Sequence, residues 1–355
     1  MRAVVVHGRD DLRIEEVVDP VMGEHEVLLA MEWGGICGSD LSYWRNGFSG
    51  TAVLQAPLIL GHEVSGRIAR IGGAARAELE RRGLGVGAAV TLHPATLVGD
   101  HRVPAALEGR TNLWPEVRYF GSAAFSPHEQ GGFSTHRAVR PEQLRAVPDG
   151  VSLREAALAE PFGVALHAVG QAVEQVGDLR GRTVLVNGCG PIGALAVAAA
   201  RHAGAGRIVA ADLSEAALRI AGRMGADGLV DLSAGQALPA DLDVAIEASG
   251  ALAALGGVIG AVRRGGTIIQ VGNLPGGEVP AALGGIVTRE IVYRGSYRFV
   301  DEITQALELM AEGIDVSPLM THEVSLDDAL RGFELAADRG TGSAKVMIDL
   351  RPAGG

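Results

Sequence analysis

Short β-branched runs alternate with alanine-rich segments of helical spacing between residues 182 and 271. The runs 182–186, 207–211, 244–246 and 267–271 predict strands, and the segments 191–203 and 214–224 predict helices. Strands and helices that alternate along the chain build parallel sheets with helices on both faces. This stretch therefore predicts an α/β fold with a doubly wound parallel sheet.

A glycine-rich turn separates the first predicted strand from the first helix. Gly188, Gly190 and Gly193 occupy the positions of a G-x-G-x-x-G pattern, and Pro191 and Ile192 open the helix. The first glycine permits a tight turn, the second lets a pyrophosphate approach the backbone, and the third allows close packing of strand and helix. The pattern predicts a dinucleotide site, and the alternative is a glycine turn in a domain of this kind that binds no nucleotide.

An acid ends the next predicted strand. Asp212 follows Gly193 by nineteen residues, and its carboxylate can accept hydrogen bonds from the ribose diol of an adenosine. The next residue is Leu213, so no arginine stands there to hold a 2′-phosphate, and NAD is favoured over NADP. The residues Val271, Gly272 and Asn273 follow the carboxyl end of a later strand, where the nicotinamide ribose lies in such sheets.

The first 150 residues have a different texture, with short strand-like runs at 4–6, 12–18, 26–32, 64–71 and 88–92. Such runs, separated by glycine, proline and aspartate, are typical of a β-rich domain. The texture changes near residues 155 and 292, and a helix is expected over 301–312 before a final segment at 344–350. We therefore expect one domain formed by residues 1–154 and 293–355, and a nucleotide-binding domain formed by residues 155–292.

A second group of residues can bind a metal ion. Cys37 lies in the glycine-rich phrase 34–40, His62 and Glu63 form a pair at 61–63, and Glu160 precedes Pro161 on an expected turn. A thiol, an imidazole and carboxylates are the ligands of a zinc ion that keeps one position open for water or substrate. Taken singly, Cys37 is better explained as a buried apolar residue and His62 as a strand-end histidine that makes a backbone hydrogen bond, and only the residues together favour a metal site.

Charge and composition exclude other classes of function. Thirty-one basic and forty-two acidic residues give a net charge of −11, and no basic tract exists that would bind nucleic acid or an anionic membrane. No apolar run is long enough to span a bilayer, so we expect a cytoplasmic protein. Two cysteines, Cys37 and Cys189, are too few for a disulfide framework.

These motifs together resemble the zinc-dependent medium-chain alcohol and polyol dehydrogenases over essentially the whole chain. The phrases 34–41, 120–123, 131–133 and 294–299 are most similar to the L-idonate 5-dehydrogenases, with sorbitol dehydrogenases as near relatives. The resemblance implies a GroES-like catalytic domain and a Rossmann domain. It also implies that Cys37, His62 and Glu160 bind one catalytic zinc, with Glu63 as an exchanging fourth ligand or an acid just behind the ligands.

The resemblance assigns further roles and shows two departures. Ser39 is implied to take the substrate proton, Tyr43 and Ser122 to line the polyol site, and Arg298 to hold a sugar-acid carboxylate or hydroxyl. Many relatives have four cysteines for a structural zinc where residues 93–119 have none, so we expect no structural zinc. Many alcohol dehydrogenases also carry a proton-relay histidine where this chain has Ser42.

The sequence thus predicts an NAD- and zinc-dependent oxidoreductase acting on a secondary alcohol of a polyol or aldonate, with L-idonate oxidised to 5-keto-gluconate as the leading reaction. Sorbitol, xylitol and L-threonine remain alternative substrates. A zinc-free relative, either a quinone-type reductase or a nucleotide-binding protein without turnover, is the alternative from another class. The family resemblance further implies a homo-oligomer, a dimer or a tetramer.

Overall fold

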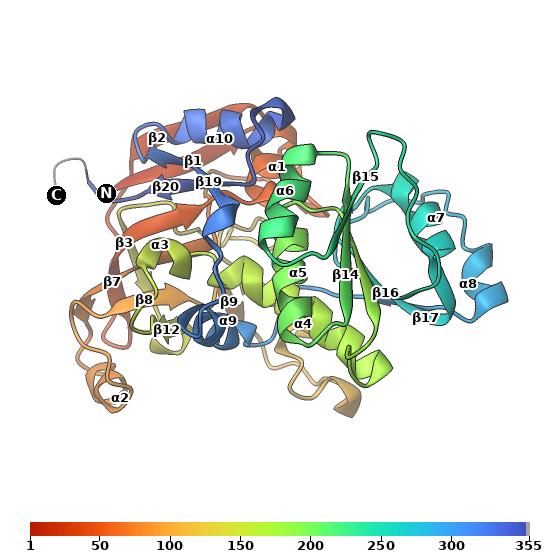
Figure 1. The fold of residues 1–355 in the computed structure, drawn as a ribbon. Helices are drawn as coiled ribbons and strands as arrows, with labels where there is room; N and C mark the ends of the chain where they lie inside the picture. The colour runs from red at the N-terminus through yellow and green to blue at the C-terminus, as the bar shows by residue number, and fades with distance from the viewer. Residues whose placement is uncertain (353–355) are drawn as a thin grey trace. The chain divides into compact units, whose positions relative to one another are not determined.

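The chain divides into two units in a computed structural model that describes residues 1–352 (Figure 1). The first unit contains Met1–Glu160, Ile303–Gly313 and the C-terminal segment from Met320, and the second contains Pro161–Glu302 and Ile314–Leu319. The domain boundaries expected from sequence texture lay at 154/155 and 292/293. The chain passes from one unit to the other after Glu160, after Glu302, after Gly313 and after Leu319.

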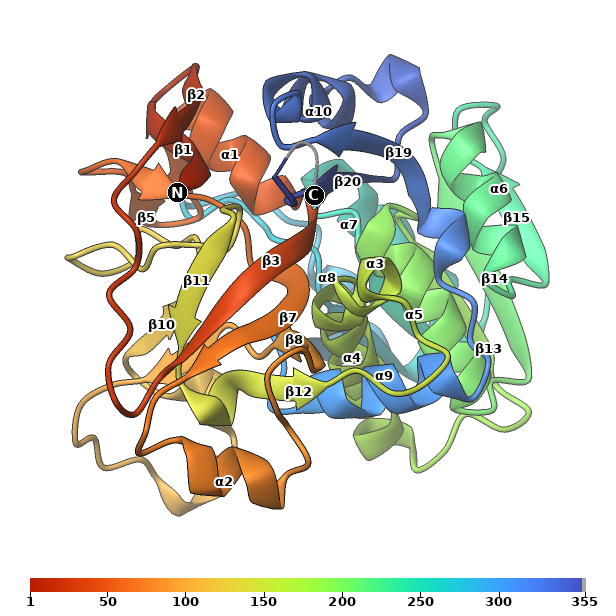
Figure 2. The same cartoon turned by 90° about the vertical axis from the view of Figure 1, so that its left-hand side faces the viewer.

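The first unit is rich in strands, and a seven-stranded sheet forms its centre. The sheet has the order β12-β8-β7-β3-β20-β19, and β11 also pairs with β3. Its strands are β3 (Val27–Gly35), β7 (Glu63–Ile71), β8 (Ala89–Leu92), β11 (His136–Val139), β12 (Leu144–Ala146), β19 (Met320–Ser325) and β20 (Lys345–Asp349). Figure 2 shows β3 and β7 running side by side through this unit. The C-terminal strand is therefore hydrogen-bonded into a sheet that the N-terminal half of the chain begins.

Smaller sheets and short helices complete the first unit. The remaining strands are β1 (Arg2–Gly8), β2 (Asp11–Glu16), β4 (Phe48–Ser49), β5 (Ala52–Val53), β6 (Leu58–Ile59), β9 (Ala95–Leu97) and β10 (Val117–Tyr119). The helices are α1 (Gly38–Asn46), α2 (Arg76–Arg81), α3 (Leu153–Ala156), α9 (Glu302–Ala311) and α10 (Ala329–Ala337). Along β3 every second side chain, Val27, Leu29 and Met31, is buried, as a strand with one face in the core requires. On α10, Phe333 packs edge-on against Trp44 and Phe133 and closes this core.

The second unit contains a six-stranded parallel sheet in the order β15-β14-β13-β16-β17-β18. Its strands are β13 (Thr183–Asn187), β14 (Arg207–Asp212), β15 (Gly228–Asp231), β16 (Leu242–Glu247), β17 (Val262–Gln270) and β18 (Val292–Gly295). All neighbouring pairs in this sheet are parallel. The strand order reverses between β13 and β16, which is where sheets of this kind bind their ligands.

Helices cover both faces of the parallel sheet, as Figure 1 shows for α4, α5 and α6 on one face and α7 and α8 on the other. They are α4 (Ala159–Val176), α5 (Pro191–His202), α6 (Glu215–Arg223), α7 (Leu252–Ala261) and α8 (Gly284–Arg289). Apolar residues in the strands are buried because both faces of the sheet are covered; examples are Leu185, Val209, Ala245 and Ile268. The expected α/β class, with a β-rich part and a doubly wound parallel sheet, is confirmed.

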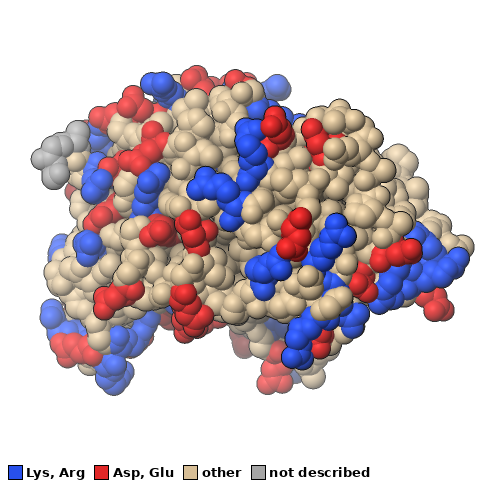
Figure 3. Space-filling view, viewed as in Figure 1, with Lys and Arg blue, Asp and Glu red and all other residues tan. Residues whose placement is uncertain are grey.

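Acidic and basic side chains are interspersed over most of the face shown in Figure 3. Among residues 1–352, no helix has the length and apolar character needed to cross a membrane.

Gly66 on β7 provides a test of how tightly β3 and β7 pair, and Gly170 on α4 provides a control. A Cβ atom on Gly66 would lie 2.2 Å from the carbonyl oxygen of Ala30 and 2.9 Å from the Cα of Met31, whereas a Cβ on the exposed helical Gly170 meets nothing within 4 Å. We predict that Gly66→Ala destabilises the protein by about 1–3 kcal/mol, because the strands must separate. Gly170→Ala should stabilise it by up to about 1 kcal/mol, because alanine restricts the unfolded chain.

Thermal unfolding of the full chain measures both effects as opposite shifts of Tm by a few degrees. A Gly66→Ala variant that melts with the wild type would show that the two strands are less closely packed than described.

Candidate functional site

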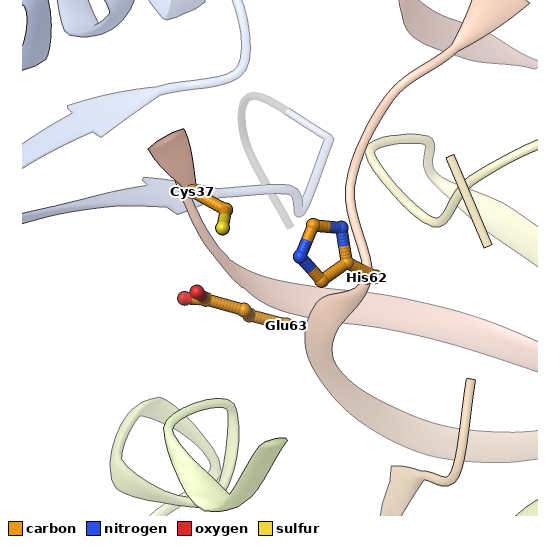
Figure 4. Close-up of side chains that lie close together, drawn as sticks. All are labelled: Cys37, His62 and Glu63. Carbon is orange, nitrogen blue, oxygen red and sulfur yellow. The ribbon is translucent and has the colours of Figure 1, made fainter. Parts of the chain in front are cut away.

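The side chains of Cys37, His62 and Glu63 converge at one end of the central sheet of the first unit (Figure 4). Cys37 follows β3 and caps α1, while Glu63 opens β7 directly after His62. The register of β3 and β7 pairs Gly35 with Glu63, which brings the two phrases together. One ligand atom from each of the three side chains lies within 4.8 Å of the others. Twenty-five residues of separation in the sequence thus become one cluster.

Asp40 holds the two halves of this cluster in place. Its carboxylate accepts hydrogen bonds from the backbone N–H of Cys37 at 2.9 Å and of Gly61 at 3.2 Å. The same group lies 3.9 Å from the Nδ1 atom of His62. Burial raises the pKa of Asp40 above its ordinary value, against the attraction of His62. Sequence reasoning gave Asp40 no role, although an acid three residues after a helix N-cap is a recognisable capping signal.

Electrostatics favour a positive charge at the centre of the cluster. Burial by itself would lower the pKa of His62, but attraction to Cys37, Asp40 and Glu160 outweighs burial and holds this pKa well above its ordinary value. A site that attracts a proton to its imidazole so strongly also attracts a metal cation, because both are stabilised by the same acidic groups.

Lys345 forms a buried ion pair with Glu63. Its Nζ atom lies 2.7 Å from both carboxylate oxygens of Glu63 and donates to the carbonyl oxygen of Ile36 at 3.0 Å. Burial alone would lower the pKa of Lys345, but the nearby Glu63 and then Cys37 raise it above its ordinary value. Lys345 is the only lysine of the chain. Sequence reasoning missed this contact because its partners are 282 residues apart.

Glu160 begins a helix rather than the expected turn. It lies in the first turn of α4 and is buried, and its Oε1 atom accepts a hydrogen bond of 2.6 Å from the hydroxyl of Tyr119. The ring of Tyr119 packs edge-on against His62, with centroids 5.8 Å apart. Burial raises the pKa of Glu160, against the attraction of His62. Proline is compatible with the first turn of a helix, so Pro161 does not force a turn here.

The donor set fits a zinc ion. Sulfur, imidazole nitrogen and carboxylate oxygen are provided by Cys37, His62 and Glu63 within one cluster, and Glu160 interacts electrostatically with that cluster. Glu63 already has a cationic partner in Lys345, whereas the hydrogen-bond partner of Glu160 is the neutral hydroxyl of Tyr119. The carboxylate of Glu160 is therefore more available to a metal ion than that of Glu63.

The other expected catalytic residues lie in different surroundings. Ser39 is half-exposed in the first turn of α1. Tyr43 is buried, and its hydroxyl accepts a hydrogen bond of 2.9 Å from the N–H of Ala123, beside Ser122. The hydroxyl of Ser42 donates to the carbonyl oxygen of Phe48 at 2.7 Å. Arg298, in the second unit, has a φ of 51° and its guanidinium lies 4.9 Å from the ring of Tyr297.

The cysteine-free stretch 93–119 contains two short 3₁₀ turns and the strand pair β9 and β10. Trp114 donates its indole N–H to the carbonyl oxygen of Val98 and packs edge-on against His101. Packing and hydrogen bonds of this kind can hold the loop without a metal.

The glycine turn of the second unit has the form that a dinucleotide requires. A Cβ on Gly188 would lie 2.5 Å from the nitrogen of Ser249, and a Cβ on Gly193 would lie 1.8 Å from the carbonyl oxygen of Gly188. A Cβ on Gly190, the N-cap of α5, would meet nothing within 4 Å. The protein's own packing requires the first and third glycines, and the second leaves open space at the helix N-terminus, beside Pro191 and Ile192, that fits a pyrophosphate.

Asp212 contacts this turn at the end of β14. Its carboxylate accepts from the N–H of Cys189 at 2.5 Å and from the N–H of Ser214 at 2.8 Å. Burial, and then the charge of Asp212, raises the pKa of the Cys189 thiol to about 12. Cys189 is therefore a buried neutral thiol beside the turn.

The expected nicotinamide-ribose segment also lies at the carboxyl edge of the sheet. Val271, Gly272 and Asn273 follow β17, and the N–H groups of Val271 and Gly272 both donate to the carbonyl oxygen of Glu247 at 2.9 Å. The segment is thus tied to the end of the neighbouring strand β16.

Comparison with known proteins identifies the family of this chain. The model of the alcohol dehydrogenase GroES-like domain matches residues 23–149, and that of the zinc-binding dehydrogenases matches residues 191–312. The sorbitol dehydrogenase of Bacillus subtilis (strain 168) is 35% identical over 98% of this chain and 97% of the relative. The L-idonate 5-dehydrogenase (NAD(P)(+)) of Escherichia coli (strain K12) is 33% identical over 98% of both.

A solved structure shares the whole architecture. The crystal structure of L-idonate 5-dehydrogenase from Escherichia coli K-12 has a TM-score of 0.86 and 32% identity, and the match covers 98% of this chain and 97% of the other. The expected GroES-like and Rossmann folds and the expected family are therefore confirmed. The chain belongs to the zinc-binding alcohol and polyol dehydrogenases, NAD(P)-dependent oxidoreductases that act on CH–OH groups.

Proposed function

We propose that this enzyme oxidises L-idonate at carbon 5 to 5-keto-gluconate with reduction of NAD to NADH. The carrying observation is Arg298, in the phrase 294–299 that resembles the L-idonate enzymes, because its planar guanidinium matches the carboxylate of an aldonate. The relationship to an L-idonate 5-dehydrogenase supports the proposal. Sorbitol and xylitol form the second candidate class, favoured by the equally similar sorbitol dehydrogenases.

One zinc ion per chain is proposed at Cys37, His62 and Glu160, with Glu63 as a fourth ligand or as an acid behind the ligands. When bound, zinc would supply a Lewis acid that polarises the hydroxyl oxygen of the substrate. The conflict between Lys345 and a cation for the same carboxylate favours the second role for Glu63. We expect no structural zinc, because residues 93–119 lack thiols.

Ser39 is the proposed first proton acceptor, with Tyr43 and Ser122 forming part of the polyol site. The hydroxyl of Ser39 would accept the proton of the substrate hydroxyl while passing its own proton on toward the coenzyme ribose, and a bound NAD would supply the acceptor for the hydride. Ser42 stands where many relatives carry a relay histidine, and its hydroxyl has no basic nitrogen that can store a second proton near neutral pH. In this proposal the proton leaves Ser39 by a route that does not use Ser42.

The dinucleotide is proposed to lie over Gly188, Gly190, Pro191, Ile192 and Gly193, with its ribose at Asp212 and its nicotinamide side at 271–273. The carboxylate of Asp212 favours NAD over NADP, because it would repel a 2′-phosphate. We further propose a cytoplasmic homo-oligomer, a dimer or tetramer, without nucleic-acid or membrane partners.

NADH production measured across L-idonate, D-gluconate, sorbitol, xylitol and L-threonine tests the substrate. We expect the highest kcat/KM for L-idonate. Arg298→Met should raise the KM for L-idonate by about tenfold to a hundredfold, the loss expected for one charge-assisted hydrogen bond, and should change the KM for sorbitol little. A higher kcat/KM for sorbitol than for L-idonate, or an equal effect of Arg298→Met on both substrates, would contradict the aldonate proposal.

Metal analysis tests the zinc site. We expect about one zinc per chain, the content of a single catalytic site. Cys37→Ala should remove most of this zinc and the turnover, while NADH still binds because the nucleotide turn belongs to other strands. Full activity of a metal-free preparation would refute the zinc role, and two zinc ions per chain would contradict the account of residues 93–119.

A double substitution tests the coenzyme preference. Asp212→Ala with Leu213→Arg should shift the ratio of kcat/KM for NADP over NAD by about tenfold or more, which corresponds to about 1.4 kcal/mol. The side chain of Leu213 is exposed, so an arginine fits there. The ratio cancels any loss common to both coenzymes from the bonds of Asp212 to the glycine turn. Leu213→Arg alone is the control and should shift the ratio less, and an unchanged ratio in the double variant would exclude Asp212 as the discriminator.

A further inference from the structure

A row of polar side chains crosses the carboxyl end of the parallel sheet. Asn187, Glu247 and Gln270 are the last residues of β13, β16 and β17, and they are register partners of one another. All three are buried, with Glu247 only 1% exposed. The strand positions that precede them are apolar and buried, as in Val184–Val186 and Val244–Ile246. The row spans the point between β13 and β16 where the strand order reverses.

Glu247 is the centre of this row. Its carboxylate accepts five hydrogen bonds, from the amides of Asn187 and Gln270, the N–H groups of Ser249 and Gly250, and the hydroxyl of Ser249. Every partner is a donor, which is the arrangement that an ionised carboxylate requires. Within residues 1–352 no lysine, arginine or histidine forms an ion pair with it. Hydrogen bonds alone therefore stabilise this buried charge.

These bonds tie together the loops that follow three strands. The carboxylate of Glu247 accepts hydrogen bonds from the loop 248–250. The backbone carbonyl oxygen of Glu247 accepts from the N–H groups of Val271 and Gly272. The amide of Gln270 donates both to Glu247 and to the carbonyl oxygen of Gly272, each at 2.7 Å. Tyr293 in turn donates its hydroxyl to Gln270. Glu247 thus anchors the loop 248–250 directly with its carboxylate, and its carboxylate reaches the segment 271–272 through the amide of Gln270.

Close glycine contacts extend the connection to the nucleotide turn. A Cβ on Gly188 would lie 2.5 Å from the nitrogen of Ser249, one on Gly250 would lie 2.5 Å from the carbonyl oxygen of Asn273, and one on Gly272 would lie 2.3 Å from the nitrogen of Gly250. The three loops are therefore in direct backbone contact. A displacement of the loop 248–250 must move both the glycine turn and the segment 271–273.

We infer that Glu247 is a positioning residue for the coenzyme, whose buried carboxylate holds the three loops at the strand-order reversal in the form that binds NAD(P). The inference rests on the proposed placement of the dinucleotide over the glycine turn and the segment 271–273. Neutral glutamine cannot replace the carboxylate, because its amide group would place a donor against donors.

Asp243 offers a matched control on the same strand. It lies near the other end of β16, where its carboxylate accepts from the N–H of Thr183 at 2.8 Å and from Arg263 at 2.9 Å. Asp243→Asn therefore also removes a carboxylate that joins β16 to its neighbours, at the edge of the sheet away from the coenzyme loops. A general loss of stability should affect both variants, and a loss of coenzyme binding should affect only one.

The experiment titrates NADH and NADPH into the wild type, Glu247→Gln and Asp243→Asn by calorimetry and by the fluorescence of the bound coenzyme. We expect Glu247→Gln to bind the preferred coenzyme about tenfold to a hundredfold more weakly, as expected for one or two charge-assisted hydrogen bonds lost. Its KM for the coenzyme should rise while the kcat at saturating coenzyme and the zinc content remain close to those of the wild type. Asp243→Asn should keep the wild-type affinity.

Each outcome has a distinct meaning. A wild type that binds neither coenzyme refutes the proposed function, whereas a Glu247→Gln variant that binds as tightly as the wild type overturns the inference alone. Equal losses in Glu247→Gln and Asp243→Asn also overturn it, because they would show a general effect on the sheet. If Glu247→Gln does not fold, Gln270→Met provides the test, because it removes the hydrogen bonds from Gln270 to Glu247 and to Gly272. We expect this variant to bind the coenzyme about threefold to tenfold more weakly. Unchanged binding would again contradict the inference.

Discussion

The buried ion pair between Glu63 and Lys345 is the interaction on which the cluster of Cys37, His62 and Glu63 depends. Lys345 comes from the C-terminal strand β20, while its two acceptors, Glu63 and the carbonyl oxygen of Ile36, belong to the N-terminal part of the sheet. Removal of one partner from such a pair costs about 3–5 kcal/mol, because an unpaired charge remains buried. The ends of the chain are therefore joined at the residues that surround Cys37 and His62.

This pair also affects which carboxylate around the cluster is free to bind a cation. Asp40 is occupied by the N–H groups of Cys37 and Gly61, and Glu63 is occupied by Lys345. Glu160 is bound by a neutral hydroxyl, so its second oxygen is the one with least competition from the protein. This difference is the basis for proposing Glu160 as the carboxylate ligand, although it is Glu63 whose carboxylate groups with Cys37 and His62 in the structure.

Patterns that are local in the sequence were predictable, and long-range pairings were not. The strand β13, the glycine turn and the helix α5 follow from contiguous residues, whose period and turn chemistry fix local structure. The edge strand β18 (Val292–Gly295) extends past the boundary expected at 292/293, because a strand this short does not show in the sequence texture where a domain ends. Glu160 was expected on a turn because proline suggested one, although a first helical turn accepts proline equally well. Lys345 has no signal in the residues around it.

The two buried carboxylates of Glu63 and Glu247 are stabilised in opposite ways. Glu63 is neutralised by an ammonium group, so a nearby cation has to compete with Lys345 for it. Glu247 is stabilised by five donors without a cation. Amide and hydroxyl donors fix the loops at this edge of the sheet without adding charge. In the segment Val244–Glu247, an acid directly follows a buried apolar strand. In a parallel sheet, such an acid indicates a carboxylate that holds the loops at the carboxyl edge.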